Sequence, residues 1–459
     1  MKKILILSIL AALTMSGALC KTTSKEITEA TKPVQLVYWR VFDDSDAFTD
    51  LIAEYNKVHP NVNITYRKLR YDEFEKKLLE AMAEDRGPDI FSIHNTWVRG
   101  YQSKLLSLPE SISLPYRTIQ GTIKKDVVWE MQNKKSLSLR DLKTQFIDQV
   151  YDDVVLPEAN EKGTANKIYG LPLSVDTLVL FYNKELLNAA GIPEPAKDWQ
   201  TLQEQVKKLT KQNTEGDIIT SGIAMGAANN VDRAMDILSV LMMQNGTKMA
   251  NDGGAATFNV LPEELQGRTS PPGIEALTFY TDFASPQKEV YSWNETMPNS
   301  LDAFIQGKAA YMLSYSYNLP IIRARAPKLN FGVAKIPQIS GNKEINYANY
   351  WVETVSKKTI HPNEAWDFIQ FIANTQNVEK YLTKTKKPTA LRSLVQKQSE
   401  DIDLYPFVSQ LLTAKSWYKG KNATAAEDAM KQMITEVIRG TYTIPEAINL
   451  GVQKVNQTL

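Results

Sequence analysis

Strand-like and helix-like segments alternate regularly between residues 34 and 94, and this alternation limits the choice of fold more than any other feature. Three stretches are rich in β-branched and aromatic residues, which predicts strands: "VQLVYWRVF", "VNITYRKL" and "DIFSIH". The two segments between them carry apolar residues at helical spacing, first from Phe48 to Val58 and then from Phe74 to Met82. The order β-α-β-α-β predicts an α/β fold, with a parallel sheet covered by helices on both faces.

Polar and aromatic side chains follow the predicted strands at the point where each strand ends. The third strand, in "GPDIFSIHNTW" (87–97), runs directly into His, Asn and Trp, and the first runs into residues 39–44. Ligands of open parallel sheets bind beyond the carboxyl ends of the strands, so we expect both ends to face one crevice. Asp43, Asp44 and Asp46 are equally suited to capping the helix that follows them.

The N-terminus has the pattern of an export signal. Lys2 and Lys3 precede an apolar run over residues 4–19, which is short for a membrane span and is followed at once by polar sequence. We therefore predict a signal peptide over residues 1–20 and an exported protein, at the cell surface or in the periplasm.

Cys20, the only cysteine, lies at the end of this apolar run and resembles the lipidated cysteine of bacterial lipoproteins. Leu19 stands where that signal usually has a small residue, so ordinary cleavage near Ala18 or an uncleaved anchor are the alternatives. Residues 21–32, rich in Thr, Ser, Lys and Glu, predict a flexible tether. The expected contact with the membrane is the lipid anchor alone.

Composition and motifs exclude several function classes. A chain of 459 residues is long enough for more than one domain, and a net charge of +1 leaves no basic face for nucleic acid. A single cysteine excludes internal disulfides, and the histidines at 59, 94 and 361 lack metal-ligand spacing. The sequence has no G-x-S-x-G, P-loop, G-x-G-x-x-G or H-E-x-x-H motif. We therefore predict a protein that is not an enzyme and holds no cofactor or metal.

The remainder of the chain continues the α/β pattern with one irregular part. Residues 104–167 predict mixed helix and loop, whereas residues 168–192 predict two strands and a helix that begins at Lys184. Further helices and strands alternate, and the tail from residue 378 is mostly helical.

Six stretches in this order resemble the extracellular solute-binding proteins of ABC importers, in the sugar-binding branch often called family 1. They are "LVYWRVFDDSDAFTDLIAEYNKVHPNVNITY", "GPDIFSIHNTW", "KIYGLPLSVDTLVLFYNKELLNAAGI", "DAFIQGKAAYMLSYS", "YANYWVETVSKKTIHPNEAWDFIQFI" and "KKPTALRSL". Residues 104–167 are longer than the linking segment usual in this family.

The resemblance implies a two-lobe fold of the type II periplasmic-binding-protein kind, with a ligand cleft between the lobes and a hinge of crossing segments. We expect one lobe over residues 33–155 and 304–355, and the other over residues 156–303 and 356–459. It also implies a monomer that captures a mono- or oligosaccharide by lobe closure and delivers it to the membrane subunits of an ABC permease.

A sugar presents an apolar face to aromatic rings and hydroxyl groups to polar side chains, and both kinds occur at predicted strand ends and loops. The candidate ligand-binding residues are Trp39, Asp44, Asn95, Trp97, Asp176, Tyr315, Trp351 and Arg392. Each also has a structural interpretation, as core, cap or turn.

Other ligands and other classes of protein stay open at this point. A polyamine would need several cleft carboxylates enclosed by aromatic rings, for which Asp43, Asp44 and Asp176 are candidates. A peptide-binding protein would have the same fold. A secreted carbohydrate-active enzyme is the less favoured alternative, because its paired carboxylates need a fixed separation that a sequence does not reveal.

Overall fold

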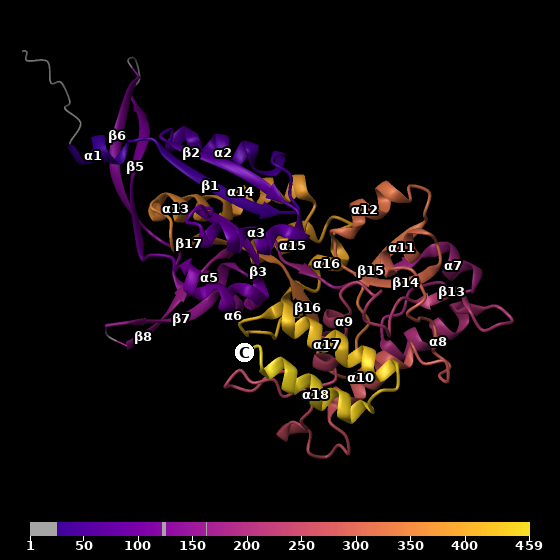
Figure 1. The fold of residues 1–459 in the computed structure, drawn as a ribbon. Coiled ribbons are helices and arrows are strands. Elements are labelled where there is room, and N and C mark those ends of the chain that lie inside the picture. Colours follow the sequence, from indigo (N-terminus) through magenta and orange to yellow (C-terminus); the bar gives the residue numbers. More distant parts are fainter. Residues whose placement is uncertain (1–24, 122–124, 162) are drawn as a thin grey trace, which may run out of the picture.

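A computed structural model describes residues 25–121, 125–161 and 163–459, in which two separate hydrophobic cores define two lobes (Figure 1). The first core draws its residues from 34–175 and 348–414. The second is built from residues 178–347, together with Phe407 and residues of the 417–455 segment. The predicted two-lobe α/β fold is confirmed.

The first lobe is built on a sheet of strand order β2-β1-β3-β17-β4, with β9 also paired to β17. Strands β1 (Val34–Val41), β2 (Val62–Leu69) and β3 (Ile90–His94) are parallel, as the alternation predicts. Strand β17 (Trp351–Ser356) runs antiparallel to them, and β4 (Leu105–Leu106) and β9 (Leu171–Pro172) each pair antiparallel with β17. Helices pack on this sheet through their apolar stripes, such as Phe48, Leu51 and Tyr55 of α2. The helices of the lobe are α2 (Asp46–Val58), α3 (Tyr71–Ala83), α4 (Val98–Tyr101), α5 (Leu139–Gln145), α6 (Asp148–Val154), α13 (Pro362–Ala373), α14 (Thr375–Thr385), α15 (Arg392–Gln398) and α16 (Tyr405–Val408).

The second lobe contains a sheet of strand order β12-β13-β14-β11-β15. Its central strand, β14, is completely buried, as expected for a strand covered on both faces. The strands are β11 (Val179–Asn183), β12 (Lys211–Gln212), β13 (Ile218–Ile223), β14 (Ala309–Ser314) and β15 (Phe331–Lys335). The helices are α7 (Lys184–Ala189), α8 (Trp199–Leu209), α9 (Ala234–Gln244), α10 (Pro272–Asp282), α11 (Ser300–Ile305), α12 (Asn318–Arg325), α17 (Ala423–Ile438) and α18 (Ile444–Asn456).

The chain crosses between the lobes along three short strands, which pair with one another in the order β10-β16-β18. They are β10 (Asp176–Thr177), β16 (Asn346–Asn349) and β18 (Ala414–Lys415). Beside them, buried Asp153 of the first lobe accepts hydrogen bonds from Tyr350 (2.6 Å) and Ser416 (2.8 Å), residues that adjoin two of the crossings. These strands form the predicted hinge.

The predicted lobe boundaries need correction. Residues 156–175 pack in the first core, whereas residues 304–336 pack in the second, because β14 and β15 pair with β11. Residues 362–411 lie mainly in the first core, because α13 packs on β17 and β5. The chain therefore changes lobe at the three crossing strands, later in each case than the sequence indicates.

Residues 104–167 form two β-hairpins around two short helices, and not the predicted mixture of helix and loop. The first hairpin pairs β5 (Ser111–Gln120) with β6 (Asp126–Lys135), and the second pairs β7 (Val155–Asn160) with β8 (Gly163–Ile168). The far end of the β5–β6 hairpin projects beyond the body of the first lobe, whereas its base packs against α13 and α2 (Figure 1). At its base, buried Ile112 and Leu114 alternate with exposed residues, which is the two-residue periodicity of a strand with one buried face.

Within the predicted tether, residues 25–30 instead form helix α1 (Lys25–Ala30), which contacts both strands of the β5–β6 hairpin, whereas residues 21–24 lie outside the described residues. The predicted signal peptide and Cys20 lie outside the described residues. Among the residues that the structure describes, no helix is long and apolar enough to cross a membrane.

Candidate binding cleft

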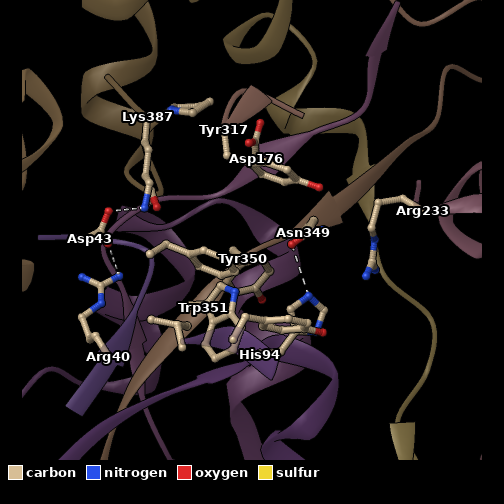
Figure 2. A pocket seen from close by; sticks show the side chains of 15 residues that line it. Arg40, Asp43, His94, Asp176, Arg233, Tyr317, Asn349, Tyr350, Trp351 and Lys387 are labelled. Atoms are coloured by element: carbon tan, nitrogen blue, oxygen red, sulfur yellow. Dashed lines mark hydrogen bonds and ion pairs between the residues drawn. The ribbon is translucent and has the colours of Figure 1, made fainter. Parts of the chain in front are cut away.

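A cavity of about 250 Å³ lies between the two lobes, at the carboxyl ends of β1 and β3 (Figure 2). Its walls come from both lobes and from the crossing segments. The lining residues are Arg40, Val41, Phe42, Asp43, Tyr71, His94, Ser174, Asp176, Arg233, Tyr317, Asn349, Tyr350, Trp351, Lys387 and Pro388.

One wall of the cavity is aromatic. The ring of Trp351 meets Phe42 and Tyr71 edge to face, with centroids 5.7 and 6.2 Å apart, and Phe42 stacks on Tyr71 at 5.7 Å. Phe42 and Tyr71 are about half exposed, although both are large and apolar. Exposed rings that converge on a cavity offer a flat surface to a ligand.

The polar end of the cavity is a buried network of charges around Asp43. This carboxylate accepts hydrogen bonds from Lys387 Nζ (2.5 Å) and from the Tyr381 hydroxyl (2.9 Å), and it forms an ion pair with Arg40 (3.1 Å). Burial alone would raise the pKa of Asp43, but Arg40 and Lys387 hold it below its ordinary value. Arg40 also lies 3.3 Å from fully buried Glu353, so the cations at this end face carboxylates of the protein.

Arg233 contributes the second lobe's cation and has a strained backbone. It adopts the left-handed conformation, with φ of 59°, directly before α9, a conformation that costs free energy in any residue other than glycine. Its guanidinium makes two hydrogen bonds to fully buried Asp236, of 2.8 and 2.9 Å, and Tyr315 donates a third to the same carboxylate. Its Nη1 lies 3.9 Å from Glu427. The side chain is therefore held in one orientation at the cleft.

Asp176 is the lining carboxylate with no cation within ion-pair distance among the described residues. It belongs to crossing strand β10 and accepts hydrogen bonds from the backbone N–H (2.9 Å) and hydroxyl (2.6 Å) of Ser316, in the second lobe. The backbone N–H of Thr177 donates a third. Burial raises the pKa of Asp176 to about 7, against the effect of these hydrogen bonds.

His94 ends β3 and connects the first lobe with a crossing strand. Its Nε2 lies 3.2 Å from the amide oxygen of Asn349, which can only accept, so Nε2 carries the proton and Nδ1 accepts from Thr96 at 2.8 Å. Burial and the nearby cation of Arg233 lower the pKa of His94 to about 4. The imidazole is therefore neutral near pH 7.

A second, smaller cavity of about 40 Å³ adjoins the first, because Tyr71, His94 and Arg233 line both. Its other walls include Trp97, Trp417 and Tyr418, together with the first turn of α17. The aromatic surface is continuous between the two cavities, since Trp97 meets Trp351 at 5.7 Å.

Three of the eight predicted ligand-binding residues line these cavities. Trp351 and Asp176 line the main cavity, and Trp97 lines the smaller one. Whether each contacts a ligand stays a prediction.

The other five candidates lie elsewhere, each for a local reason. Trp39 is 7% exposed and packs beneath Arg67, because neighbouring strand residues point to opposite faces and Arg40 takes the side toward the cavity. Asp44 lies on the surface and pairs with Lys68. The remaining three have structural partners: buried Asn95 donates to Asp153, buried Tyr315 donates to Asp236, and Arg392 binds Phe146 and Asp148.

The sequence reasoning missed several lining residues. Arg40, Phe42 and Tyr71 are next to recognised strand ends and helix starts, so the strand-end rule contained a signal for them. Arg233 and Tyr317 precede helices in the second lobe, and no local pattern shows that these helix starts face the first lobe. Within the described ranges, no group of three or more His, Cys, Asp or Glu residues could hold a metal ion.

Comparison with known proteins gives a consistent result. A family model described as bacterial extracellular solute-binding protein matches residues 42–379. The galactooligosaccharide-binding protein of Bacillus subtilis is 23% identical over 405 residues, which cover 86% of this chain and 82% of that protein. The solved cyclic alpha-maltosyl-1,6-maltose binding protein from Arthrobacter globiformis has a TM-score of 0.71 at 20% identity, covering 93% of this chain and 99% of that one. The sugar-binding protein MalE from Xanthomonas citri has a TM-score of 0.69 at 18% identity, with 93% and 97% covered.

Proposed function

This chain belongs to the bacterial extracellular solute-binding protein family, and from that premise we propose that it captures a carbohydrate for an ABC importer. The relatives and solved structures named above bind oligosaccharides or are described as sugar-binding proteins. We propose the same class of ligand for this chain, a mono- or oligosaccharide.

The observation that carries this proposal is the pairing of an aromatic wall with hydrogen-bonding groups in one interlobe cavity. Trp351, Phe42 and Tyr71 offer faces suited to the C–H surface of a sugar ring. Asp176 and Asn349 offer oxygens around the same space, which suits a ring of hydroxyl groups.

The charge balance of the cleft favours a neutral ligand. Lys387 pairs with Asp43, and Arg40 lies between Asp43 and Glu353. Arg233 pairs with Asp236, so each cation that lines the cavity has a carboxylate partner. A polyamine would need several unpaired carboxylates, but among the candidates Asp43 is neutralised by its partners and Asp44 lies on the surface.

Capture would proceed by hinge bending at β10, β16 and β18. Arg233 and Tyr317 stand on the second lobe, opposite Trp351 and Lys387 of the first, so a ligand can contact all of them only when the lobes approach each other. Binding energy from both lobes then shifts the population toward the closed form, which the permease recognises.

We also propose the cellular setting. The protein is exported, acts as a monomer without catalytic activity, and is held at the membrane through an acylated Cys20. Its partners are the transmembrane subunits of an ABC permease. Release of sugar fragments during a binding assay would contradict the absence of catalysis.

A ligand panel tests the proposed function. Mono- and oligosaccharides, polyamines and short peptides are added separately to the purified protein, and the thermal unfolding temperature is measured, since a ligand of the native state stabilises it. We expect stabilisation by sugars alone. The substitution Trp351→Ala should reduce this stabilisation, because it weakens binding, whereas the control Trp129→Ala, in the β5–β6 hairpin outside the cleft, should leave it intact. Stabilisation by polyamines alone would refute the assignment.

A further inference from the structure

The β5–β6 hairpin carries an exposed apolar pair at its far end. Ile119 and Val127 are direct cross-strand partners, 61% and 52% exposed, and so lie on the same face of the hairpin. Two-stranded hairpins gain little stability from their own strands in water, so exposed aliphatic side chains at such a tip are not explained by folding.

The same face continues with residues suited to a lipid–water boundary. Arg117 and Trp129 form the neighbouring pair two positions further from the tip, and both are partly exposed. Lys125, directly before β6, is exposed. An indole, aliphatic side chains and cations on one face are the combination that settles at the headgroup level of a bilayer. The acidic residues Asp126 and Glu130 alternate onto the opposite face.

Helix α1 brings the start of the mature chain to this hairpin. It lies beside β5 and β6 and contacts both (Figure 1). The side chain of Asn61 donates to the carbonyl oxygens of Ala30 and Lys32, which ties the end of this segment to the lobe. Cys20 stands five residues before Lys25, a span of at most about 18 Å in extended chain. An anchor at Cys20 would therefore keep this end of the first lobe close to the membrane.

We propose that the distal face of the β5–β6 hairpin, formed by Ile119, Val127, Arg117, Trp129 and Lys125, docks on the lipid surface to which Cys20 anchors the chain. Together with the anchor, this second contact fixes the first lobe against the bilayer and leaves the second lobe free to move about the hinge. The proposal requires export and anchoring at Cys20, but it does not depend on which solute the cleft binds.

The β7–β8 hairpin of the same lobe provides an internal comparison. Its strands carry "VLPEAN" and "GTANKI", and among its described residues no large apolar side chain is exposed. A hairpin that merely extends from the lobe would therefore not need the residues found in β5 and β6.

The sole cysteine allows a direct test. The chain from Cys20 onward contains every residue of both cores, and its only thiol can be coupled to maleimide lipids in phosphatidylglycerol–phosphatidylethanolamine vesicles. Hydrogen exchange of the hairpin amides is then compared between the coupled and the free protein. We expect exchange in the distal half of β5–β6 to slow at least threefold on coupling, with β7–β8 unchanged.

The variant Ile119→Ser/Val127→Ser should lose this protection and keep its unfolding temperature, because both side chains are exposed in the folded protein. Unchanged exchange on coupling, or equal protection of β7–β8, would overturn the proposal. Protection that appears only when permease subunits share the vesicle would also overturn it, since the face would then bind protein. Sugar binding is also measured on the coupled protein. If the sugar still binds, any of these outcomes overturns only the docking proposal and leaves the proposed function intact.

Discussion

The Arg233–Asp236 pair should show a large energetic coupling. Asp236 has no exposed surface, and its carboxylate accepts two hydrogen bonds from Arg233 and one from Tyr315. Removing one member of a buried ion pair costs about 3–5 kcal/mol, because the other charge stays buried without its partner.

The two single substitutions differ in what they leave behind. Arg233→Ala leaves the fully buried carboxylate of Asp236 without its partner, so we expect the free energy of unfolding to fall by about 4 kcal/mol. Asp236→Ala leaves a guanidinium that is 19% exposed and lies 3.9 Å from Glu427, so we expect a smaller loss, of about 3 kcal/mol. The double variant should lose little more than Arg233→Ala alone, which gives a coupling energy of about 3 kcal/mol.

Native-state hydrogen exchange of the α9 amides is the suitable assay. It reports the stability of the second lobe by itself, whereas a single denaturation curve would merge two lobes that need not unfold together. The matched control is Arg323→Ala with Asp403→Ala, an ion pair whose side chains are both about half exposed and which should couple by less than 1 kcal/mol. If the effects at Arg233 and Asp236 add within about 0.5 kcal/mol, the pair does not hold the guanidinium as we describe.

Three further results are expected. Trp351→Ala should weaken sugar binding by about 10- to 100-fold in calorimetry, whereas an unchanged affinity would remove the aromatic wall from the site. The pKa of Asp176 in the folded protein is raised to about 7, so the wild type should lose stability as pH rises from about 4 to 7, whereas Asp176→Asn should not. The same change of melting temperature with pH in both proteins would contradict this. The pKa of His94 in the folded protein is lowered to about 4, so the wild type should lose stability as pH falls from about 6.5 to 4. The variant His94→Gln should not show this loss. If both proteins lose the same stability in acid, the assignment to His94 is wrong.

The fold could be predicted where local pattern and topology agree. The alternation over residues 34–94 gave the three parallel strands, and the rule for strand ends pointed to the edge where the cavity lies. Residues 104–167 were misjudged because the hairpins are partly solvated, which weakens the apolar alternation that identifies a strand, as in β6.

The site could be predicted only in part, because it is assembled from distant segments. Asp176 lies in crossing strand β10, and Trp351 begins the strand that follows crossing strand β16; both belong to stretches that carry the family resemblance. Trp39 was a reasonable candidate, yet the pleat turns its neighbour Arg40 to the cavity instead, a choice of face that composition does not reveal. Arg233 could not be found, because its position depends on the rotation of one lobe relative to the other.

The triple crossing between the lobes has a consequence for the order in which the protein can fold. Strand β17, at residues 351–356, lies between β3 and β4 in the first sheet, so that sheet stays incomplete until more than three quarters of the polypeptide has been synthesised. Until then, β3 and β4 lack the strand that lies between them, and this delay in folding suits a chain that crosses a membrane before it folds. For the same reason, a chain truncated after the second sheet would lack β17 and would expose the unpaired edge of β3. Such an edge promotes aggregation, so the fragment would not be an independently folded lobe.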